Sequence, residues 1–215
     1  MYAVVMSRTR VRATREQTRE RLFEAAAEVF AATGIGAASI EAIAASAGLT
    51  RGAFYSNFAD KDELVTAMLA DHVEHTTRRY VELLARHRDP DDFMEALRTV
   101  DRSTQDPLGR SPLLHLELLL HAARAAPPRQ DLTGLITSRR RIIVDIIEGT
   151  GMSQSQDGLD TEQLAAMLLA MEDGYRLHQL IDSTSTPPDS FLRSVSALQG
   201  LMRSRGGGRL QQLAD

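Results

Sequence analysis

The 215-residue chain contains neither cysteine nor tryptophan, and it has a single lysine. Without cysteine there is no disulfide bond, no thiolate metal ligand and no cysteine nucleophile, and a reducing compartment is compatible with the sequence. Long apolar runs are also lacking, because the most apolar stretch, residues 113–120, is interrupted by His115 and Glu117. We therefore expect no export signal, no membrane span and a cytoplasmic protein.

The charge of the chain is unevenly distributed. With 43% apolar and 25% charged residues, the composition is that of a globular protein with a net charge of −4. Residues 1–61 hold eight basic and six acidic side chains (+2), which leaves −6 for the remainder. Arg8, Arg10, Arg12 and Arg15 all precede the first acidic residue, Glu16. Such a basic arm either contacts phosphate groups or forms a solvated tail.

Helical periodicity covers nearly the whole chain, and we find no convincing run of period-two alternation. The sequence therefore predicts an all-α protein of about nine helices. The expected helices span residues 14–34, 40–47, 50–58, 60–87, 91–104, 112–125, 129–148, 161–182 and 188–204. Residues typical of helix N-caps precede the first four: Thr14, Ser39, Thr50 and Asp60. Gly34 and Gly48 stand where the first two helices end.

The third expected helix has two dissimilar faces. Phe54 and Phe58 share one face, and such a short helix needs them as anchors, with Phe23 and Phe30 as the expected partners. The opposite face is centred on Gly52, so it is almost bare of side chains. Glycine costs up to about 1 kcal/mol relative to alanine in a helix, and close approach of another surface to the backbone is a physical reason for it.

Two short helices joined through residues 47–49 form a helix-turn-helix arrangement, for which the approaching surface is a DNA major groove. The hydroxyl and amides at Thr50 can meet a phosphate, and Tyr55 can donate its hydroxyl to another. Lys61 lies at a helix N-terminus, which already favours an anion. Arg51 can reach either a phosphate or a guanine.

The segment SIEAIAASAGLTRGAFYSNFADKDEL, Ser39 to Leu64, resembles the DNA-binding region of the tetracycline-repressor (TetR) family of bacterial transcriptional regulators. The resemblance extends from about Thr14 to Leu64. It is carried by the Gly48-Leu49-Thr50 turn, Gly52, Phe54-Tyr55, Phe58, Lys61 and Leu64.

The resemblance implies a role for each matching residue. Side chains implied to hold the DNA backbone are Ser39, Thr50, Tyr55 and Lys61. Residues implied to face the bases are Arg51, Gly52, Ala53 and the neighbouring Ser56. Asn57 departs from the histidine or tyrosine often found at its position, and the same phosphate-contacting role is carried over to it. The implied domains are a DNA-binding domain at 1–60, a helical ligand-binding and dimerisation domain at 61–205, and a flexible tail at 206–215.

The last two long helices are expected to form a homodimer. In 161–182 two apolar stripes lie on different faces: Leu164, Leu168, Met171, Tyr175 and His178, then Ala166, Ala170, Leu177 and Ile181. A helix that is apolar on two faces should bury one in its own domain and one against a partner. In 188–204 the row Phe191, Val195, Leu198 and Met202 lies beside the small residues Ser194, Ala197 and Gly200.

An effector pocket is expected in the second domain. Candidate lining residues are His115, Met171, Tyr175 and His178, with core packing as the alternative role for each. His72 and His75 interleave with acidic residues and could form part of a metal site, but a solvated polar face is the preferred interpretation, so no metal is predicted. No Gly-x-Ser-x-Gly elbow or Walker loop occurs, and we predict no catalytic residues and no cofactor.

Together these features predict a ligand-responsive repressor that binds a palindromic double-stranded operator as a dimer and is released by an unidentified small molecule. Alternatives are an activator of the same fold, a sequence-indifferent DNA binder, and a helical small-molecule-binding protein without specific DNA binding. An enzyme is the weakest alternative.

Overall fold

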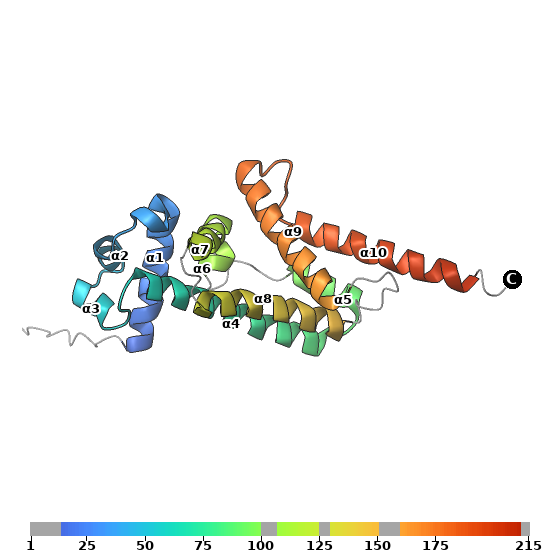
Figure 1. Ribbon diagram of the computed structural model, residues 1–215, viewed down its shortest axis with the longest axis horizontal. Helices are drawn as coiled ribbons and strands as arrows, with labels where there is room; N and C mark the ends of the chain where they lie inside the picture. The colour runs from blue at the N-terminus through green and yellow to red at the C-terminus, as the bar shows by residue number, and fades with distance from the viewer. Residues whose placement is uncertain (1–13, 100–106, 125–129, 151–159, 212–215) are drawn as a thin grey trace, which may run out of the picture. The chain divides into compact units, whose positions relative to one another are not determined.

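The computed structural model describes residues 14–99, 107–124, 130–150 and 160–211. Within these ranges every regular element is a helix, which confirms the predicted all-α class (Figure 1). The helices are α1 (Arg15–Ala37), α2 (Ile40–Ser46), α3 (Arg51–Tyr55), α4 (Lys61–Arg86), α5 (Pro90–Thr99), α6 (Pro107–Arg110), α7 (Pro112–Arg124), α8 (Gln130–Gly149), α9 (Thr161–Ile181) and α10 (Ser190–Gln211). None of these described helices is long and apolar enough to cross a membrane. Most of the predicted basic arm lies outside the described residues.

Several helices differ from those predicted. Helix α3 ends at Tyr55 rather than near residue 58, and the single-turn α6 was not predicted. Helix α10 continues through three successive glycines to Gln211, so residues 206–211 are helical where a flexible tail was expected. Extending an existing helix adds one hydrogen bond per residue, and this outweighs the low helix propensity of glycine.

The chain divides into two compact units after Leu64, whereas the prediction put the domain boundary after residue 60. Unit 1 contains α1, α2, α3 and the first turn of α4, and unit 2 contains the remainder of α4 and the helices that follow. Helix α4 is therefore continuous across the boundary between the two units.

The first helix of unit 1 begins at the N-cap residue predicted from the sequence. The Thr14 hydroxyl accepts from the Gln17 amide at 3.2 Å, and the Gln17 side chain accepts from the Thr14 amide at 3.0 Å, which completes a capping box. The helical dihedral angles of α1 break at Gly34, where φ is +75°. Gly48 follows α2 with φ of +62°, a left-handed conformation that glycine adopts without strain.

Aromatic side chains hold unit 1 together. The rings of Phe23 and Phe58 stack with centroids 5.9 Å apart, and those of Phe54 and Phe58 are 5.8 Å apart. Phe30 and Phe54 are fully buried. Burial of each such ring stabilises the folded state by roughly 1.5–3 kcal/mol. This core is what fixes the five-residue helix α3, which would not be stable alone.

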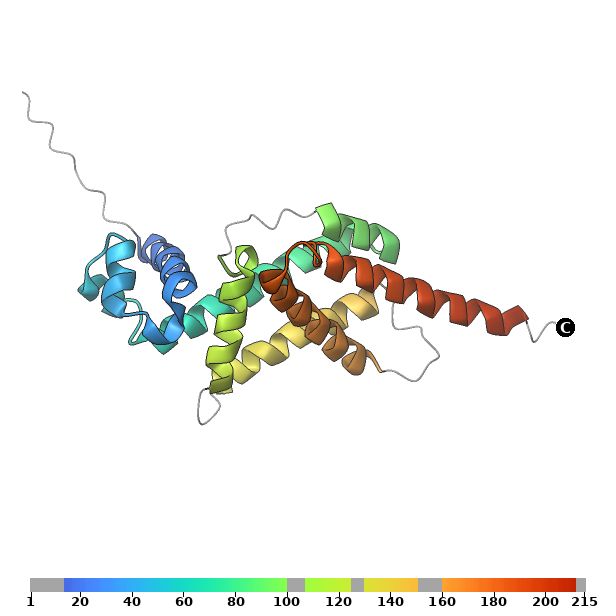
Figure 2. The ribbon, with the colours of Figure 1, turned by 90° about the horizontal axis from the view of Figure 1, so that it is seen from above.

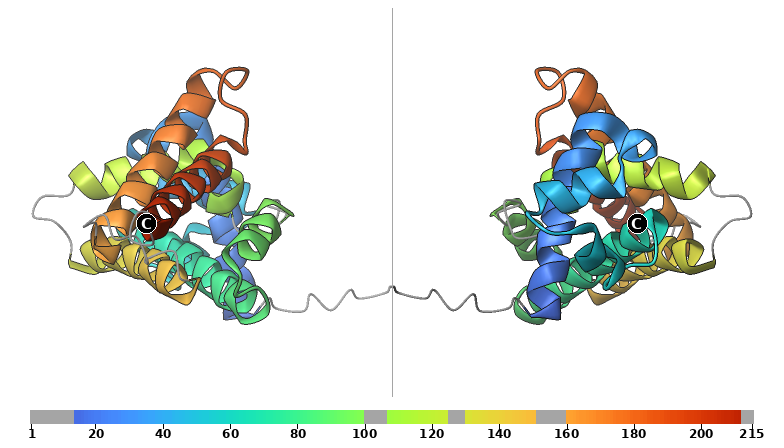
Figure 3. Two further views of the ribbon diagram at one scale, coloured as in Figure 1. Left: turned by 90° about the vertical axis from the view of Figure 1, so that its right-hand side faces the viewer. Right: turned by 90° about the vertical axis from the view of Figure 1, so that its left-hand side faces the viewer.

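Unit 2 is built around α9, which packs against α7, α8 and α10 (Figures 2 and 3). One core cluster joins α5, α8, α9 and α10 through Met94, Val144, Ile147, Leu164, Ala165, Leu168, Leu192 and Val195. A second joins α4, α5 and α8 around Phe93, Ile142 and Ile146. The inward face of α10 carries Leu192 and Val195, while Leu198, predicted to lie in the same row as Val195, is 38% exposed.

Candidate nucleic-acid interface and effector cavity

The outer face of α3 is nearly flat. Gly52 is exposed, and a Cβ atom built on it would meet nothing closer than the Thr50 hydroxyl at 3.8 Å, which is ordinary van der Waals contact. Its φ is not in the left-handed region, so neither the fold of unit 1 nor the local backbone requires glycine here. A requirement for glycine at this position therefore has to come from outside the unit.

Two predicted phosphate contacts begin helices beside this face. The Ser39 hydroxyl accepts from the Ala42 amide, and the Thr50 hydroxyl accepts from the Ala53 amide, each at 3.1 Å. Both side chains are exposed. A hydroxyl group that accepts a hydrogen bond can still donate its own hydrogen, so both N-cap side chains can also donate a hydrogen bond to a phosphate oxygen.

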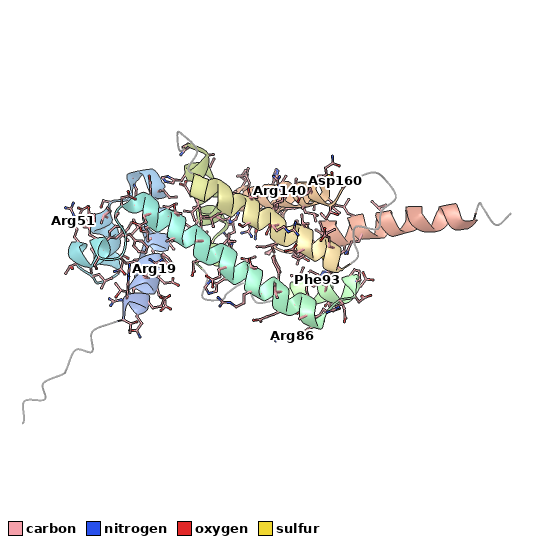
Figure 4. The ribbon with its side chains drawn as sticks, turned by 60° about the horizontal axis from the view of Figure 1, so that its bottom comes forward. Arg19, Arg51, Arg86, Phe93, Arg140 and Asp160 are labelled. Atoms are coloured by element: carbon pink, nitrogen blue, oxygen red, sulfur yellow. The ribbon has the colours of Figure 1, made fainter. Side chains whose placement is uncertain are left out.

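Arg51 and Tyr55 form a connected pair on the exposed surface (Arg51 is labelled in Figure 4). Arg51 Nη2 donates to the Tyr55 hydroxyl oxygen at 3.2 Å, and its guanidinium lies 5.4 Å from the centre of the tyrosine ring. Nη1 also pairs with Glu41 at 2.9 Å. The hydrogen bond to Tyr55 and the charge of Glu41 both raise the pKa of Arg51. An ion pair as exposed as this one contributes little to stability, so Arg51 can leave Glu41 for a nucleic acid at low cost.

Asn57 does not occupy the predicted phosphate-contacting position. Its side chain is buried, and Nδ2 donates to the Ala53 carbonyl at 2.8 Å. The Ser56 hydroxyl donates to the same carbonyl at 2.9 Å, although Ser56 itself is exposed. The reason is the early end of α3, which leaves carbonyls of its last turn to be satisfied by side chains.

Lys61 also differs from its predicted role as a phosphate clamp. Its ammonium nitrogen lies 2.5 Å from the Ile35 carbonyl, 2.9 Å from that of Ala38 and 3.3 Å from that of Gly36. An ammonium group has three hydrogens, and three carbonyls surround this one. Lys61 thus fastens the start of α4 to the segment between α1 and α2.

We expect the Lys61→Met substitution to act on stability rather than on phosphate contacts. Losing hydrogen bonds from a charged donor should lower the free energy of unfolding by about 2–3 kcal/mol, measured by urea denaturation of the full chain. The slope of log K for DNA against log salt concentration should stay unchanged. A phosphate clamp would predict the reverse pattern, with wild-type stability and a slope reduced in magnitude by about 0.9 for each protomer.

Arg21 has a structural role that the sequence did not indicate. From α1, its Nη2 donates to the Ala47 carbonyl at 2.5 Å and lies 3.4 Å from that of Gly48. These carbonyls belong to the turn of the helix-turn-helix. In the sequence, Arg21 is only one of the positive charges of the N-terminal region, since its partners lie 26 and 27 residues away.

Unit 2 contains a cavity of about 110 Å³. Its walls come from α4, α5, α6, α8, α9 and α10 and are mostly apolar, and α8 contributes the four isoleucines Ile142, Ile143, Ile146 and Ile147. Four charged side chains also line it: Arg79, Arg139, Glu172 and Arg176.

Ion pairs connect three of these charged groups. Arg139 Nη2 lies 3.0 Å from Glu172 and 2.9 Å from Asp173, and Arg176 lies 2.8 Å from Glu172. Burial alone would raise the pKa of Glu172, but the nearby Arg176 and Arg139 hold it well below its usual range. Burial likewise opposes ionisation of Asp173, yet hydrogen bonds from His115 and Arg139 lower its pKa. Both carboxylates are therefore ionised at neutral pH.

None of the four predicted ligand-binding residues is among those that line this cavity. His115 is buried against Asp173 at 3.2 Å, and burial lowers its pKa to about 4, so it is neutral at pH 7. The Tyr175 and Ser194 hydroxyls are 2.6 Å apart. Met171 packs on the core cluster, and His178 is exposed. The apolar spacing in the sequence predicted helix α9, but it did not indicate which side of α9 lines the cavity.

The two histidines considered for a metal site, His72 and His75, have different surroundings. His72 lines the cavity, whereas His75 bonds back to Asp71 of its own helix. Among the described residues, no group of three or more histidine, aspartate or glutamate side chains is placed to hold a metal ion.

Comparison with known proteins identifies the helix-turn-helix unit. The family model for "Bacterial regulatory proteins, tetR family" matches residues 22–68. The HTH-type transcriptional regulator SrpR of Pseudomonas putida is 49% identical over 55 residues, which are 26% of this chain and 26% of SrpR, so the match spans about a quarter of that relative. TtgR of the same species, also an HTH-type transcriptional regulator, is 28% identical over 188 residues, covering 76% of this chain and 82% of TtgR.

The fold of the whole chain also has counterparts among solved structures. The transcriptional regulator FadR from Bacillus subtilis, solved in complex with stearoyl-CoA, aligns with a TM-score of 0.65 at 18% identity. The alignment covers 85% of this chain and 96% of FadR. At this level of identity the comparison establishes the fold of unit 2 together with that of unit 1, and no more.

Proposed function

Because the chain belongs to the TetR family of bacterial regulatory proteins, we propose that it is a transcriptional regulator, which binds a palindromic operator as a homodimer and releases it when a small-molecule effector binds. The observation that carries the proposal is Gly52. An exposed glycine costs the helix up to about 1 kcal/mol, and nothing within unit 1 requires it. Close approach of a DNA groove to α3 supplies the missing reason.

In this proposal α3 enters the major groove. Gly52 and Ala53 allow the backbone to approach the base edges, which Arg51 and Ser56 can contact from either side. Ser39, Thr50 and Tyr55 contact the flanking phosphates and set the register of the helix. Lys61 and Asn57 act indirectly, by holding the helices that present these groups.

A second copy of the chain is the proposed partner of α9 and α10. Large apolar side chains with at least 38% exposure, among the residues of these helices whose burial is described, are Met167, Leu177, Leu180, Ile181, Leu198 and Leu201. A twofold axis through this surface would bury the same residues on both copies. An operator for such a dimer would have two half-sites about 34–36 Å apart, one turn of DNA.

Helix α4 is the proposed connection between effector and DNA. His72, Val73 and Thr76 of α4 line the cavity of unit 2, while Lys61 at its start is bonded to unit 1. An effector that displaces α4 would therefore also displace the segment that Lys61 holds. A preference of about 10⁴-fold for the released conformation would carry the population from nearly all bound to nearly all free.

Repression is the proposed outcome of binding, and the effector is bound without being transformed. The solved complex of FadR with stearoyl-CoA supports an organic ligand as the effector of such a fold. An activator would use the same residues and differ only in where its operator lies relative to a promoter. A reporter gene measured with and without the protein distinguishes the two. Bacterial DNA lies in the cytoplasm, so the proposed regulator acts there.

The test is competition binding to the DNA upstream of the protein's own gene. We expect this DNA to bind at least about 10³-fold more tightly than scrambled DNA of equal length and composition at the same salt concentration. Equal affinity for both would contradict a specific regulator and favour a sequence-indifferent DNA binder.

A further inference from the structure

The charged lining of the cavity in unit 2 is not balanced. Arg79, Arg139 and Arg176 contribute three positive charges, and Glu172 is the single carboxylate among the residues that line it. Glu172 pairs with both Arg139 and Arg176, and Asp173 supports Arg139 from outside the lining. Counting all five groups leaves a net charge of +1.

Arg79 is the group that accounts for the excess charge. Among the described residues, its guanidinium contacts the ring of the adjacent Tyr80, whose centre lies 5.9 Å from the guanidinium carbon. Its Nε is buried and has no hydrogen-bond partner there. A buried donor without a partner costs more than a typical hydrogen bond contributes, and an acceptor that enters the cavity would remove that cost.

The geometry of a guanidinium selects the acceptor. Nε–H and the adjacent Nη–H of an arginine point the same way and match the two oxygens of a carboxylate. Most of the other lining side chains are apolar, among them four isoleucines of α8, Leu168 of α9 and Leu192 of α10, while His72 and Thr76 of α4 are polar. Such walls accept a hydrocarbon chain or ring and offer no counter-charge to a cation.

We propose that this cavity binds a small amphipathic carboxylate, with its carboxylate on Arg79 and its apolar part against the aliphatic side chains of α8, α9 and α10. A cavity of about 110 Å³ holds on the order of ten water-sized groups, which matches the ten non-hydrogen atoms of octanoate. The inference rests on the proposed function in one respect, because it names the chemical class of the effector.

Isothermal titration of the full chain, without DNA, tests this assignment with three probes of equal tail length: octanoate, octanol and octyltrimethylammonium. We expect octanoate to bind at least about tenfold more tightly than octanol, and the cation to bind more weakly than either. Equal binding of octanoate and octanol, or preference for the cation, would overturn the assignment.

Substitutions at Arg79 determine whether this side chain carries the preference. Arg79→Gln should bring octanoate to the affinity of octanol while octanol binding stays unchanged. Arg79→Lys keeps the charge and loses the paired donors, so it should keep part of the preference for octanoate. This variant also provides a test if the glutamine variant does not fold. Arg86→Gln is the matched control, since it removes an exposed arginine from the same helix (labelled in Figure 4). If Arg79→Gln and Arg79→Lys both keep the full preference, the assignment is wrong.

The outcomes separate this inference from the proposed function. A chain that selects octanoate but binds no specific DNA contradicts the proposed function and leaves the carboxylate site in place. A chain that binds its upstream DNA and does not distinguish octanoate from octanol contradicts the carboxylate site alone.

Discussion

Replacing Gly52 with leucine should reduce operator affinity more than about 100-fold while the protein stays folded. The glycine is exposed, and a Cβ there makes only an ordinary contact with Thr50, so the free protein has room for the larger side chain. Leucine is also the better helix former, and the free energy of unfolding should rise by about 0.5–1 kcal/mol. In the complex, however, the side chain would hold α3 away from the base edges in both half-sites.

Gly36→Leu is the matched control for this substitution. Gly36 lies in the same unit, is exposed, and has nothing within 4 Å of the position that a Cβ atom would take. Operator affinity, measured by fluorescence anisotropy, should stay within about threefold of wild type for this variant. If Gly52→Leu binds the operator as well as Gly36→Leu does, then α3 does not approach DNA closely. If Gly52→Leu unfolds the chain, the fold itself requires the glycine and close approach of DNA no longer explains it.

Introducing charge on the exposed face of α9 should separate the proposed dimer. Leu177 and Ile181 lie one turn apart and are 48% and 74% exposed, so Leu177→Glu/Ile181→Glu should change the stability of the protomer by no more than about 0.5 kcal/mol. In a twofold interface the double variant would bury four unpaired carboxylates. We expect a monomer in sedimentation at micromolar concentration and an operator affinity at least about 100-fold lower, because the two reading helices are no longer joined.

Val81→Glu controls for charge placed on any exposed apolar side chain. Val81 of α4 is 60% exposed and lies outside the proposed dimer surface. It should leave both the sedimentation behaviour and the operator affinity unchanged. A Leu177→Glu/Ile181→Glu protein that still sediments as a dimer would show that the two copies meet elsewhere.

The helices of unit 1 could be predicted because their signals are local. Thr14, Ser39 and Thr50 cap helices whose first turns follow directly in the sequence, and each accepts the amide three residues on. The inward packing of Phe54 and Phe58 could also be predicted, since the two residues are four positions apart and their rings are in contact, although Phe58 lies beyond the end of α3. Spacing along a single helix is sufficient to identify such features.

The roles of Lys61 and Arg21 could not be predicted, because they depend on residues distant in sequence. The carbonyls that bind Lys61 lie 23 to 26 residues before it, and those that bind Arg21 follow it by 26 and 27. Backbone carbonyls carry no sequence signature. A charged residue near a DNA-binding helix is therefore as compatible with fastening the fold as with contacting phosphate.

The charged lining of the cavity could not be predicted for a related reason. Arg139 stands beside Arg140 and Arg141 in the sequence, and such a run is usually solvated. In the structure the Arg139 side chain is 16% exposed and paired with α9, while Arg140 is exposed (Figure 4). Which member of the run turns inward depends on how α8 is rotated against α9, and periodicity within one helix does not specify that rotation.

The most direct measurement compares two free energies for Gly52→Ala, the smallest change that tests the approach of α3 to DNA. The substitution adds one methyl group at an exposed site where it fits, so urea denaturation should give a free energy of unfolding higher by up to about 1 kcal/mol. Titration of operator DNA should give a binding free energy weaker by about 1 kcal/mol or more. If α3 enters the groove, the substitution should stabilise the free protein and weaken its binding to DNA. A Gly52→Ala protein that is more stable and binds its operator with wild-type affinity would contradict it.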